Sequence, residues 1–246
     1  MADVSRKTWN RYLENLRKIS IVAAKELLKY MLKNDYSSKE GMQRLVDYAF
    51  ALATKYGEGA AALTCEMYDA LALLSEVIVP SAEPAATATY GEVAKAMYGT
   101  RSNPNVMADA IGRAVKMASV DTMMQNALRD GAEWAWIPSG DTCAYCITLA
   151  SRGWQRASKS AIKDGHAEHV HANCDCTYAI RFKPDINIQG YDPQQYLDMY
   201  ESADGDTPTE RINALRREMY AKNKDTINEQ KRAAYAAKKA VEDGGN

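Results

Sequence analysis

Apolar residues in the first part of the chain recur at helical spacing. Within residues 5–33 they return every three or four positions, as expected for a helix that packs by one face. The apolar stripe consists of Trp9, Leu13, Leu16, Ile19 and Val22. The remaining faces are rich in Lys and Arg, so we expect a long amphipathic helix with a basic outer side.

Two more helices are expected next. Ser37 and Glu40 have the spacing of a capping box, which should open a helix that runs to about Lys55 and ends at the sequence YGEG. Residues 60–78 are rich in Ala and Leu on more than one face, which predicts a central helix. Cys65 lies inside it, and we expect a buried core residue without chemistry.

Residues 79–89 contain two prolines among small residues and are predicted to form a linker. Thr89 and Glu92 form another capping-box pattern, which predicts a short helix to about Met97.

A longer helix should follow. Asn103 as N-cap and Pro104 in the first turn indicate its start, and Gly131 is suited to the C′ position after Asp130. Its apolar residues recur at mixed helical spacing, and we expect them to form core or partner-helix contacts. They are Val106, Ile111, Val115, Met117, Met123, Met124 and Leu128.

The pattern changes after residue 131. The stretch EWAWIPSG has aromatic and branched residues followed by Pro138 and Gly140, which predicts a short strand leading into a turn. Residues 176–182, CTYAIRF, alternate Cys, Tyr, Ile and Phe on one face and predict a second short strand. The two form a hairpin-like β element.

The last part of the chain is predicted to be helical. Asp192 and Pro193 start a short helix, and Thr207, Pro208 and Glu210 combine an N-cap, a first-turn proline and a capping box. The helix that they open is polar and basic, with a thin apolar stripe of Ile212, Leu215 and Met219. Such a helix is marginal alone. We expect it either to pack on a partner or to remain a solvated tail.

The fold class expected from these patterns is mainly α with a small zinc-stabilised α+β module. The chain has 246 residues, which fits one core plus a smaller unit. We divide it into a helical region at 1–130, a Cys/His metal-binding module at 131–190 and a basic helical tail at 191–246. No apolar run reaches the roughly 18 residues of a membrane span and no signal peptide is recognisable, so we expect no membrane contact and a cytoplasmic site of synthesis.

The formal net charge of −1 conceals two basic ends. Residues 1–33 hold eight Lys/Arg against three Asp/Glu, and residues 209–240 hold nine against four. Residues 34–208 between them hold fourteen against twenty-three. These ends are either solvated helix faces or surfaces that contact nucleic acid or an acidic partner.

Cysteine and histidine are concentrated in one window. Four of the five cysteines and all three histidines lie between Cys143 and Cys176. A CxxC pair can bind a tetrahedral zinc through two thiolates, and the downstream donors would close the shell from a separate segment. The candidate ligands are Cys143, Cys146, His171, Cys174 and Cys176, with His166 and His169 as substitutes. A structural Zn²⁺ would staple a module that has few core residues.

Three other interpretations of this window stay open. A redox CxxC normally belongs to a βαβ unit, which the sequence does not predict here. Structural disulfides would require an oxidising compartment. A catalytic zinc would need an open coordination position and a carboxylate base, for which Glu168 or Asp141 could serve.

The stretch WIPSGDTCAYCITLASRGW followed by HVHANCDCTYAIRF resembles the cysteine-rich signature of phage minor head proteins of the Mu F-like head morphogenesis family. The resemblance covers about residues 133–183. It implies a virion protein of the capsid interior, made in the host cytoplasm and placed beside the portal. The expected role is head morphogenesis and DNA packaging or ejection.

The partners that this resemblance implies are the portal protein and other capsid or scaffolding proteins, with packaged DNA as a further partner of the basic terminal helices. No catalytic motif follows residue 183, so we expect no enzyme. The alternative function is a zinc-dependent nuclease-like protein or toxin effector with His166, Glu168 and His169 as active groups.

Overall fold

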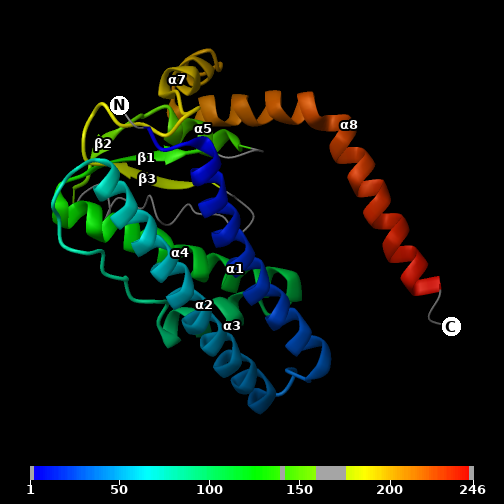
Figure 1. Cartoon of the computed structure of the whole chain (residues 1–246). Coiled ribbons are helices and arrows are strands. Elements are labelled where there is room, and N and C mark those ends of the chain that lie inside the picture. The colour runs from blue at the N-terminus through cyan, green and yellow to red at the C-terminus, as the bar shows by residue number, and fades with distance from the viewer. Residues whose placement is uncertain (1–2, 139–141, 159–175, 244–246) are drawn as a thin grey trace.

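A computed structural model describes residues 3–138, 142–158 and 176–243 of the chain, apart from some side chains near the end of the last helix. The described part is mainly helical with one small sheet, as the sequence predicts (Figure 1). None of its helices combines the length and the hydropathy that a membrane span requires.

Three long helices form the body of the molecule. They are α1 (Arg6–Lys33), α2 (Lys39–Leu74) and α4 (Pro104–Asp130), with the shorter α3 (Tyr90–Thr100) packed beside α2 and α4. Their buried faces share one apolar core. Its largest fully buried side chains include Trp9, Leu27, Leu45, Tyr68, Met107, Ile111 and Met123. The stripe predicted on α1 holds except at Val22, which is 42% exposed, because the buried face continues through Ala23 instead.

Helix α2 corrects the expected break at YGEG, because it runs without interruption through both glycines. A Cβ atom on Gly57 would lie 2.8 Å from the Cγ2 atom of Thr87 in the linker, so this glycine allows the linker to cross the helix. The start of α2 also differs by one residue. The hydroxyl of Ser38, not of Ser37, accepts the capping bond, from the Gly41 N–H at 2.9 Å.

The other helix signals in the body are confirmed. Thr89 and Glu92 form the predicted capping box at the start of α3. Asn103 caps α4 ahead of Pro104, and Gly131 ends that helix with a left-handed φ of 67°. At these points local side-chain chemistry is sufficient to set the helix boundary.

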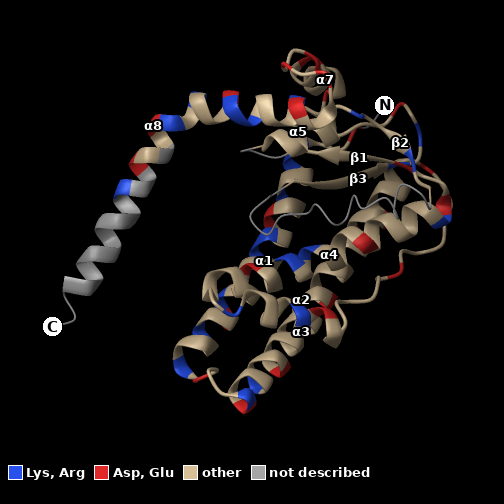
Figure 2. Ribbon diagram, turned by 180° about the vertical axis from the view of Figure 1, so that it is seen from behind, with Lys and Arg blue, Asp and Glu red and all other residues tan. Residues whose placement is uncertain are grey.

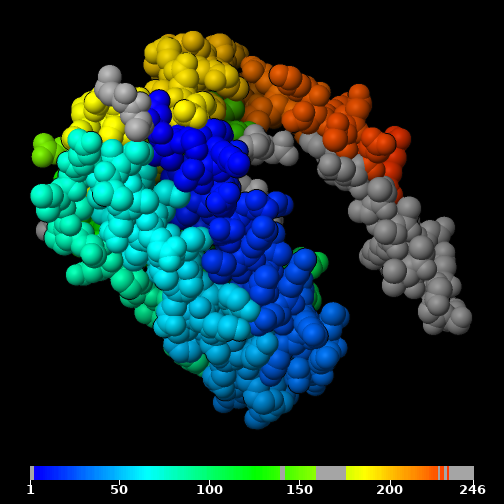
Figure 3. Space-filling model, viewed as in Figure 1, coloured from blue at the N-terminus to red at the C-terminus, as the bar shows by residue number. Residues whose placement is uncertain are grey.

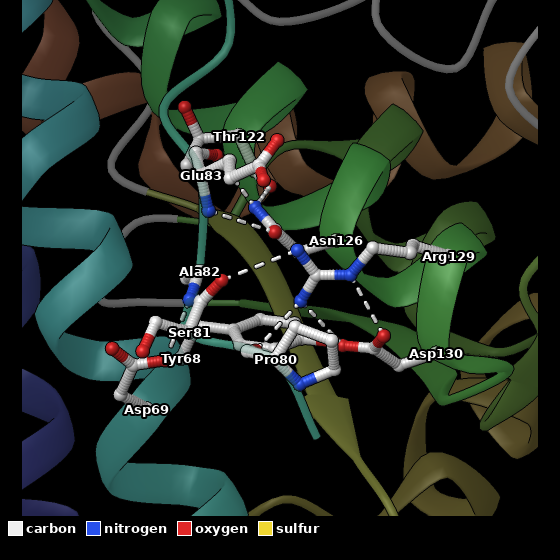
Figure 4. A network of polar contacts seen from close by, with 10 residues as sticks. All are labelled: Tyr68, Asp69, Pro80, Ser81, Ala82, Glu83, Thr122, Asn126, Arg129 and Asp130. Carbon is white, nitrogen blue, oxygen red and sulfur yellow. Dashed lines mark hydrogen bonds and ion pairs between the residues drawn. The ribbon is translucent and has the colours of Figure 1, made fainter.

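The linker forms neither helix nor strand, and side chains of α4 bind its backbone (Figure 4). The Asn126 amide accepts from the Glu83 N–H at 2.9 Å and donates to the Glu83 carbonyl at 2.8 Å. The Arg129 guanidinium donates to the carbonyls of Pro80 and Ser81 at 2.8 and 3.2 Å. These bonds replace the secondary-structure pairing that the linker lacks.

Three antiparallel strands form the sheet, in the order β2-β1-β3. They are β1 (Glu133–Ile137), β2 (Gln155–Arg156) and β3 (Thr177–Arg181). The two longer strands were predicted, whereas β2 was not. Residues 177–180 are all buried, so β3 does not have the one buried face that its alternation predicts. The reason is that α2 and α4 contact this strand.

The C-terminal helices form a second, smaller apolar cluster. Helices α5 (Ala144–Ala150), α7 (Pro193–Glu201) and α8 (Pro208–Asp243) meet there. The buried members of the cluster are Ala144, Ile147, Ala203, Ala214 and Leu215. Beyond Met219, α8 leaves the body and projects from it (Figures 1 and 2).

The N-terminal segment is tied to the end of the sheet region. Val4 forms a parallel bridge with Ile188, and its carbonyl accepts from the Gln189 N–H at 3.0 Å. The main apolar core is continuous from the helical body into the sheet. The division into three parts at residues 130 and 190 stays a prediction.

Candidate metal centre

Cys143 and Cys146 are brought together by the first turn of α5. Cys143 is the N-cap of this helix, and its Sγ accepts from the Cys146 N–H at 3.5 Å. The two sulfur atoms are also 3.5 Å apart. The sequence predicted a turn here, and the correction is that the pair lies on a helical turn. Cys146 is buried, whereas Cys143 is half-buried.

This separation fits a shared metal ion. Two sulfurs that each lie about 2.3 Å from a tetrahedral zinc are roughly 3.8 Å apart, close to the observed distance. A disulfide between them would require an S–S distance of about 2.05 Å. The distance is therefore compatible with two ligands of one metal ion and too long for a disulfide.

Cys176 is buried immediately before β3, whose first residue, Thr177, pairs with Ile137 at the end of β1. The chain leads from Ile137 to Cys143 in six residues, so both halves of the cysteine motif adjoin one end of the sheet. Among the described residues, however, no three His, Cys, Asp or Glu side chains are grouped to hold a metal. The predicted ligands His171 and Cys174 lie outside the described residues, as do His166 and His169.

An aromatic wall borders the cysteine pair. Tyr178 packs edge-on between Trp134 and Trp136, with ring centroids at 4.8 and 4.6 Å. Burial raises the pKa of Tyr178 far above its ordinary value, so this phenol stays neutral. Burial also raises the pKa of Tyr145, which lies between the two cysteines in sequence. These rings belong to the main apolar core or pack against it, beside the cysteine pair.

Arg181 braces the outer side of the sheet. Its guanidinium pairs with Glu133 at 2.7 Å, donates to the Pro184 carbonyl at 2.8 Å and stacks over the Trp154 ring at 4.7 Å. A bond to Asn187 at 3.1 Å extends the brace to the segment that binds the N-terminus. Nothing in the sequence predicts the contacts with Glu133 and Trp154, because these residues are far from Arg181 along the chain.

The surroundings of the pair also bear on its redox interpretation. The CxxC follows β1 and begins α5, which is a strand-to-helix junction. Each sheet pairing of β1 is antiparallel, so this junction does not belong to a βαβ unit of the redox type. The predicted absence of such a unit is confirmed for the described residues.

A pocket lies on the helical body, away from Cys143 and Cys146. It has a volume of about 550 Å³ and is lined by α3, α4 and the linker, with Glu92, Arg113 and Asp121 as its charged residues. Burial, with a smaller effect from Glu92, raises the pKa of Asp121 to about 6. The importance of this carboxyl was not predicted, although an Asp next to Val120 in the apolar pattern of α4 was a visible signal.

Comparison with known proteins gives one family. Neither the search of curated proteins nor the search of solved structures found a match. A family model described as VG15 protein matches residues 3–203, which include the helical body, the sheet and the cysteine motif. This match supports a viral protein in general, without specifying the Mu F-like head family. The chain belongs to the VG15 protein family, a family of viral gene products.

Proposed function

We propose that this VG15 protein is a structural minor head protein of a tailed phage, located in the capsid interior beside the portal. Its role is in head morphogenesis and in DNA packaging or ejection, without enzymatic activity. The observation that carries the proposal is α8, a helix of 36 residues that is anchored at one end and projects from a well-packed body. Figure 3 displays this division between body and arm.

The body supports a scaffold role because its polar groups serve packing. The Asn126 and Arg129 side chains hold the linker, and Arg181 holds the sheet. Cys143 and Cys146 fit two ligands of a structural Zn²⁺, and the predicted partners in the shell are His171, Cys174 and Cys176. Such an ion would stabilise the sheet module by joining its two ends.

The partners we propose are the portal protein and other capsid or scaffolding proteins. Packaged DNA is a further partner for the basic outer faces of α1 and α8. On α8 the exposed cations available for such contacts include Arg216, Arg217, Lys222, Lys224 and Arg232. Contacts of this kind weaken as salt rises, because counterions screen both surfaces.

Mass spectrometry of purified particles and of procapsids tests this function. We expect the protein in at least one of the two, at low copy number, and its absence from both would contradict the proposal. A pull-down of the portal protein by the full chain should succeed. The variant Lys222→Glu/Lys224→Glu should lose portal binding, while Lys7→Glu/Arg11→Glu on α1 is a control with the same charge change.

A further inference from the structure

One continuous stretch of the chain carries acidic residues and no basic ones. Residues 56–94 hold six Asp/Glu and no Lys or Arg. They comprise the C-terminal half of α2, the linker and the start of α3. The six acids are Glu58, Glu66, Asp69, Glu76, Glu83 and Glu92, and all are exposed.

Along α2 these acids form a straight stripe. Its exposed positions are Glu58, Ala62, Glu66, Asp69 and Leu73, spaced by 4, 4, 3 and 4 residues, so they share one helix face. Leu73 is 80% exposed, and Ile78 just beyond the helix is 104% exposed. Leu73 is therefore an apolar position on the stripe that a docked helix can cover.

Helix α8 carries a stripe of the opposite charge. Its positions are Arg217, Ala221, Lys224, Asn228 and Arg232, spaced by 4, 3, 4 and 4 residues. Four of these residues are exposed and Asn228 is half-buried. Tyr220, 47% exposed, lies beside the start of the stripe. The acidic residues of this segment, Glu218, Asp225 and Glu229, lie along one edge of this stripe, because Asp225 follows Ala221 by four residues and precedes Arg232 by seven.

The two stripes match when the helices run antiparallel. Read backwards, the α8 spacing becomes 4, 4, 3 and 4, which is the spacing on α2. Each stripe spans sixteen residues, or about 22 Å of helix. In this register Glu58 lies opposite Arg232 and Glu66 opposite Lys224. Leu73 then lies at the end of the contact near Arg217 and Tyr220, where the tyrosine ring can cover it.

The charges that this register pairs are available for it. Within the described residues, neither Glu58 nor Glu66 forms an ion pair or a hydrogen bond through its side chain, and the same holds for Lys224 and Arg232. Asp69 differs, because its carboxylate accepts from the Ala82 N–H at 2.8 Å. It still adds negative potential to the stripe.

The arm does not reach the acidic stripe of its own chain. The base of α8 packs on α5 and α7, and the helix then extends away from α2 in both ribbon views (Figures 1 and 2). In the space-filling view the C-terminal half of α2 is open on the opposite side of the body from the arm (Figure 3).

We propose that the arm of one copy of this protein docks, antiparallel, on the α2 stripe of a second copy. Each copy then offers one arm and one acceptor face, so the contact is head-to-tail and builds a ring or an open row of copies. The inference stands on charge, spacing and exposure, and it does not depend on the virion role.

Sedimentation velocity of the full chain in about 50 mM and about 500 mM salt is the first test. We expect concentration-dependent association at low salt and at least a tenfold higher dissociation constant at high salt, because exposed ion pairs are screened. A chain that stays monomeric at low salt overturns the proposal. If that monomer instead binds a DNA duplex through Lys224 and Arg232, the arm is a nucleic-acid contact.

Charge exchange is the second test. The acceptor variant Glu58→Arg/Glu66→Lys and the arm variant Lys224→Glu/Arg232→Glu should each remain monomeric. An equimolar mixture of them should associate again into alternating copies, because the native arm meets the native acceptor and the reversed arm meets the reversed acceptor. The chain with all four changes should associate again. Failure of either reversal to prevent association would overturn the proposed register.

The control variant is Asp198→Lys/Glu201→Lys, which reverses two exposed carboxylates on α7 instead. It should associate as the unmodified chain does. If this control lost association to the same extent, the net negative charge of the protein rather than the α2 stripe would attract the arm. The proposal would then be wrong. Circular dichroism melts of all variants confirm that each one is folded.

Discussion

Helices α4 and α8 begin with the same local signals, an N-terminal capping side chain followed by proline, but their surroundings differ. Asn103 and Pro104 open α4, which is buried on several sides along its whole length. Thr207 and Pro208 open α8, in which Ala214 and Leu215 are the buried residues among those described.

This difference separates what capping residues determine from what the distribution of apolar residues determines. Capping residues decide where a helix begins, because they satisfy backbone N–H groups that have no partner in the helix. They do not decide what the helix packs against. The distribution of apolar residues does that, and α8 has only a thin stripe near its start. The arm is available for partners because its sequence gives the body nothing further to bury.

The largest expected effect concerns the cysteine pair in the body. Cys143→Ser should abolish zinc binding and lower the Tm by about 10 °C or more, because the proposed metal would join two separate segments. Metal analysis and thermal melts with and without a chelator measure this. Cys65→Ser, at a half-buried position in α2, should retain the metal. Protein that contains no zinc, with a Tm that a chelator leaves unchanged, would contradict the metal centre.

A cavity in α4 should lower the free energy of unfolding much more than truncation of a side chain on α8. Ile111→Ala removes a fully buried side chain and should lower the free energy of unfolding by about 3 kcal/mol. Tyr220→Ala on the arm should change it by about 0.5 kcal/mol or less. Urea unfolding followed by circular dichroism gives both values. Val106→Ala, at an exposed position of α4, is the matched control, and a large effect there would contradict the assigned burial.

The buried carboxyl of Asp121 gives the body a pH dependence. Its folded-state pKa of about 6 lies above the unfolded value of 3.8, so the folded state binds the proton more tightly. Stability should therefore fall as pH rises from about 4 to about 6. Asp121→Asn should remove this fall and add about 2 kcal/mol at pH 7. Asp225→Asn on α8 should leave the profile unchanged. Equal profiles for the Asp121 variant and the parent would refute the raised pKa.

The smallest expected change in the free energy of unfolding concerns the ends of two helices. Glu76 follows α2 with a left-handed φ of 50°, whereas Gly131 follows α4 at 67°. A residue with a Cβ is strained there, so Glu76→Gly should raise the free energy of unfolding by about 1 kcal/mol, and Gly131→Ala should lower it by a similar amount. Urea midpoints measure both. Changes of the same sign would show that contacts, not backbone strain, dominate these positions.

The sequence predicted helix starts and strand positions well where neighbouring residues determine them. The capping box at Thr89, the cap at Asn103 and the left-handed Gly131 are all observed. It failed at Gly57, because a glycine that ends a helix and one that admits a crossing segment look alike in sequence. Only the position of Thr87 in space distinguishes them.

The candidate site was predicted only in part. The spacing of Cys143 and Cys146 predicted that their sulfurs would meet, and they do. The brace of Arg181 on Trp154 was not predictable, because the two residues meet only through the sheet. The predicted ligation by His171 and Cys174 stays a prediction. Local spacing can propose donors, but tertiary packing decides which of them converge.

The bridge between Val4 and Ile188 also has a consequence for the order of folding on the ribosome. Val4 cannot form its final pairing until more than 180 further residues have been added to the chain. Contacts between such distant residues are slow to form, because a long loop must close first. The helical body can therefore assemble early, while the N-terminal segment waits for the sheet to be completed.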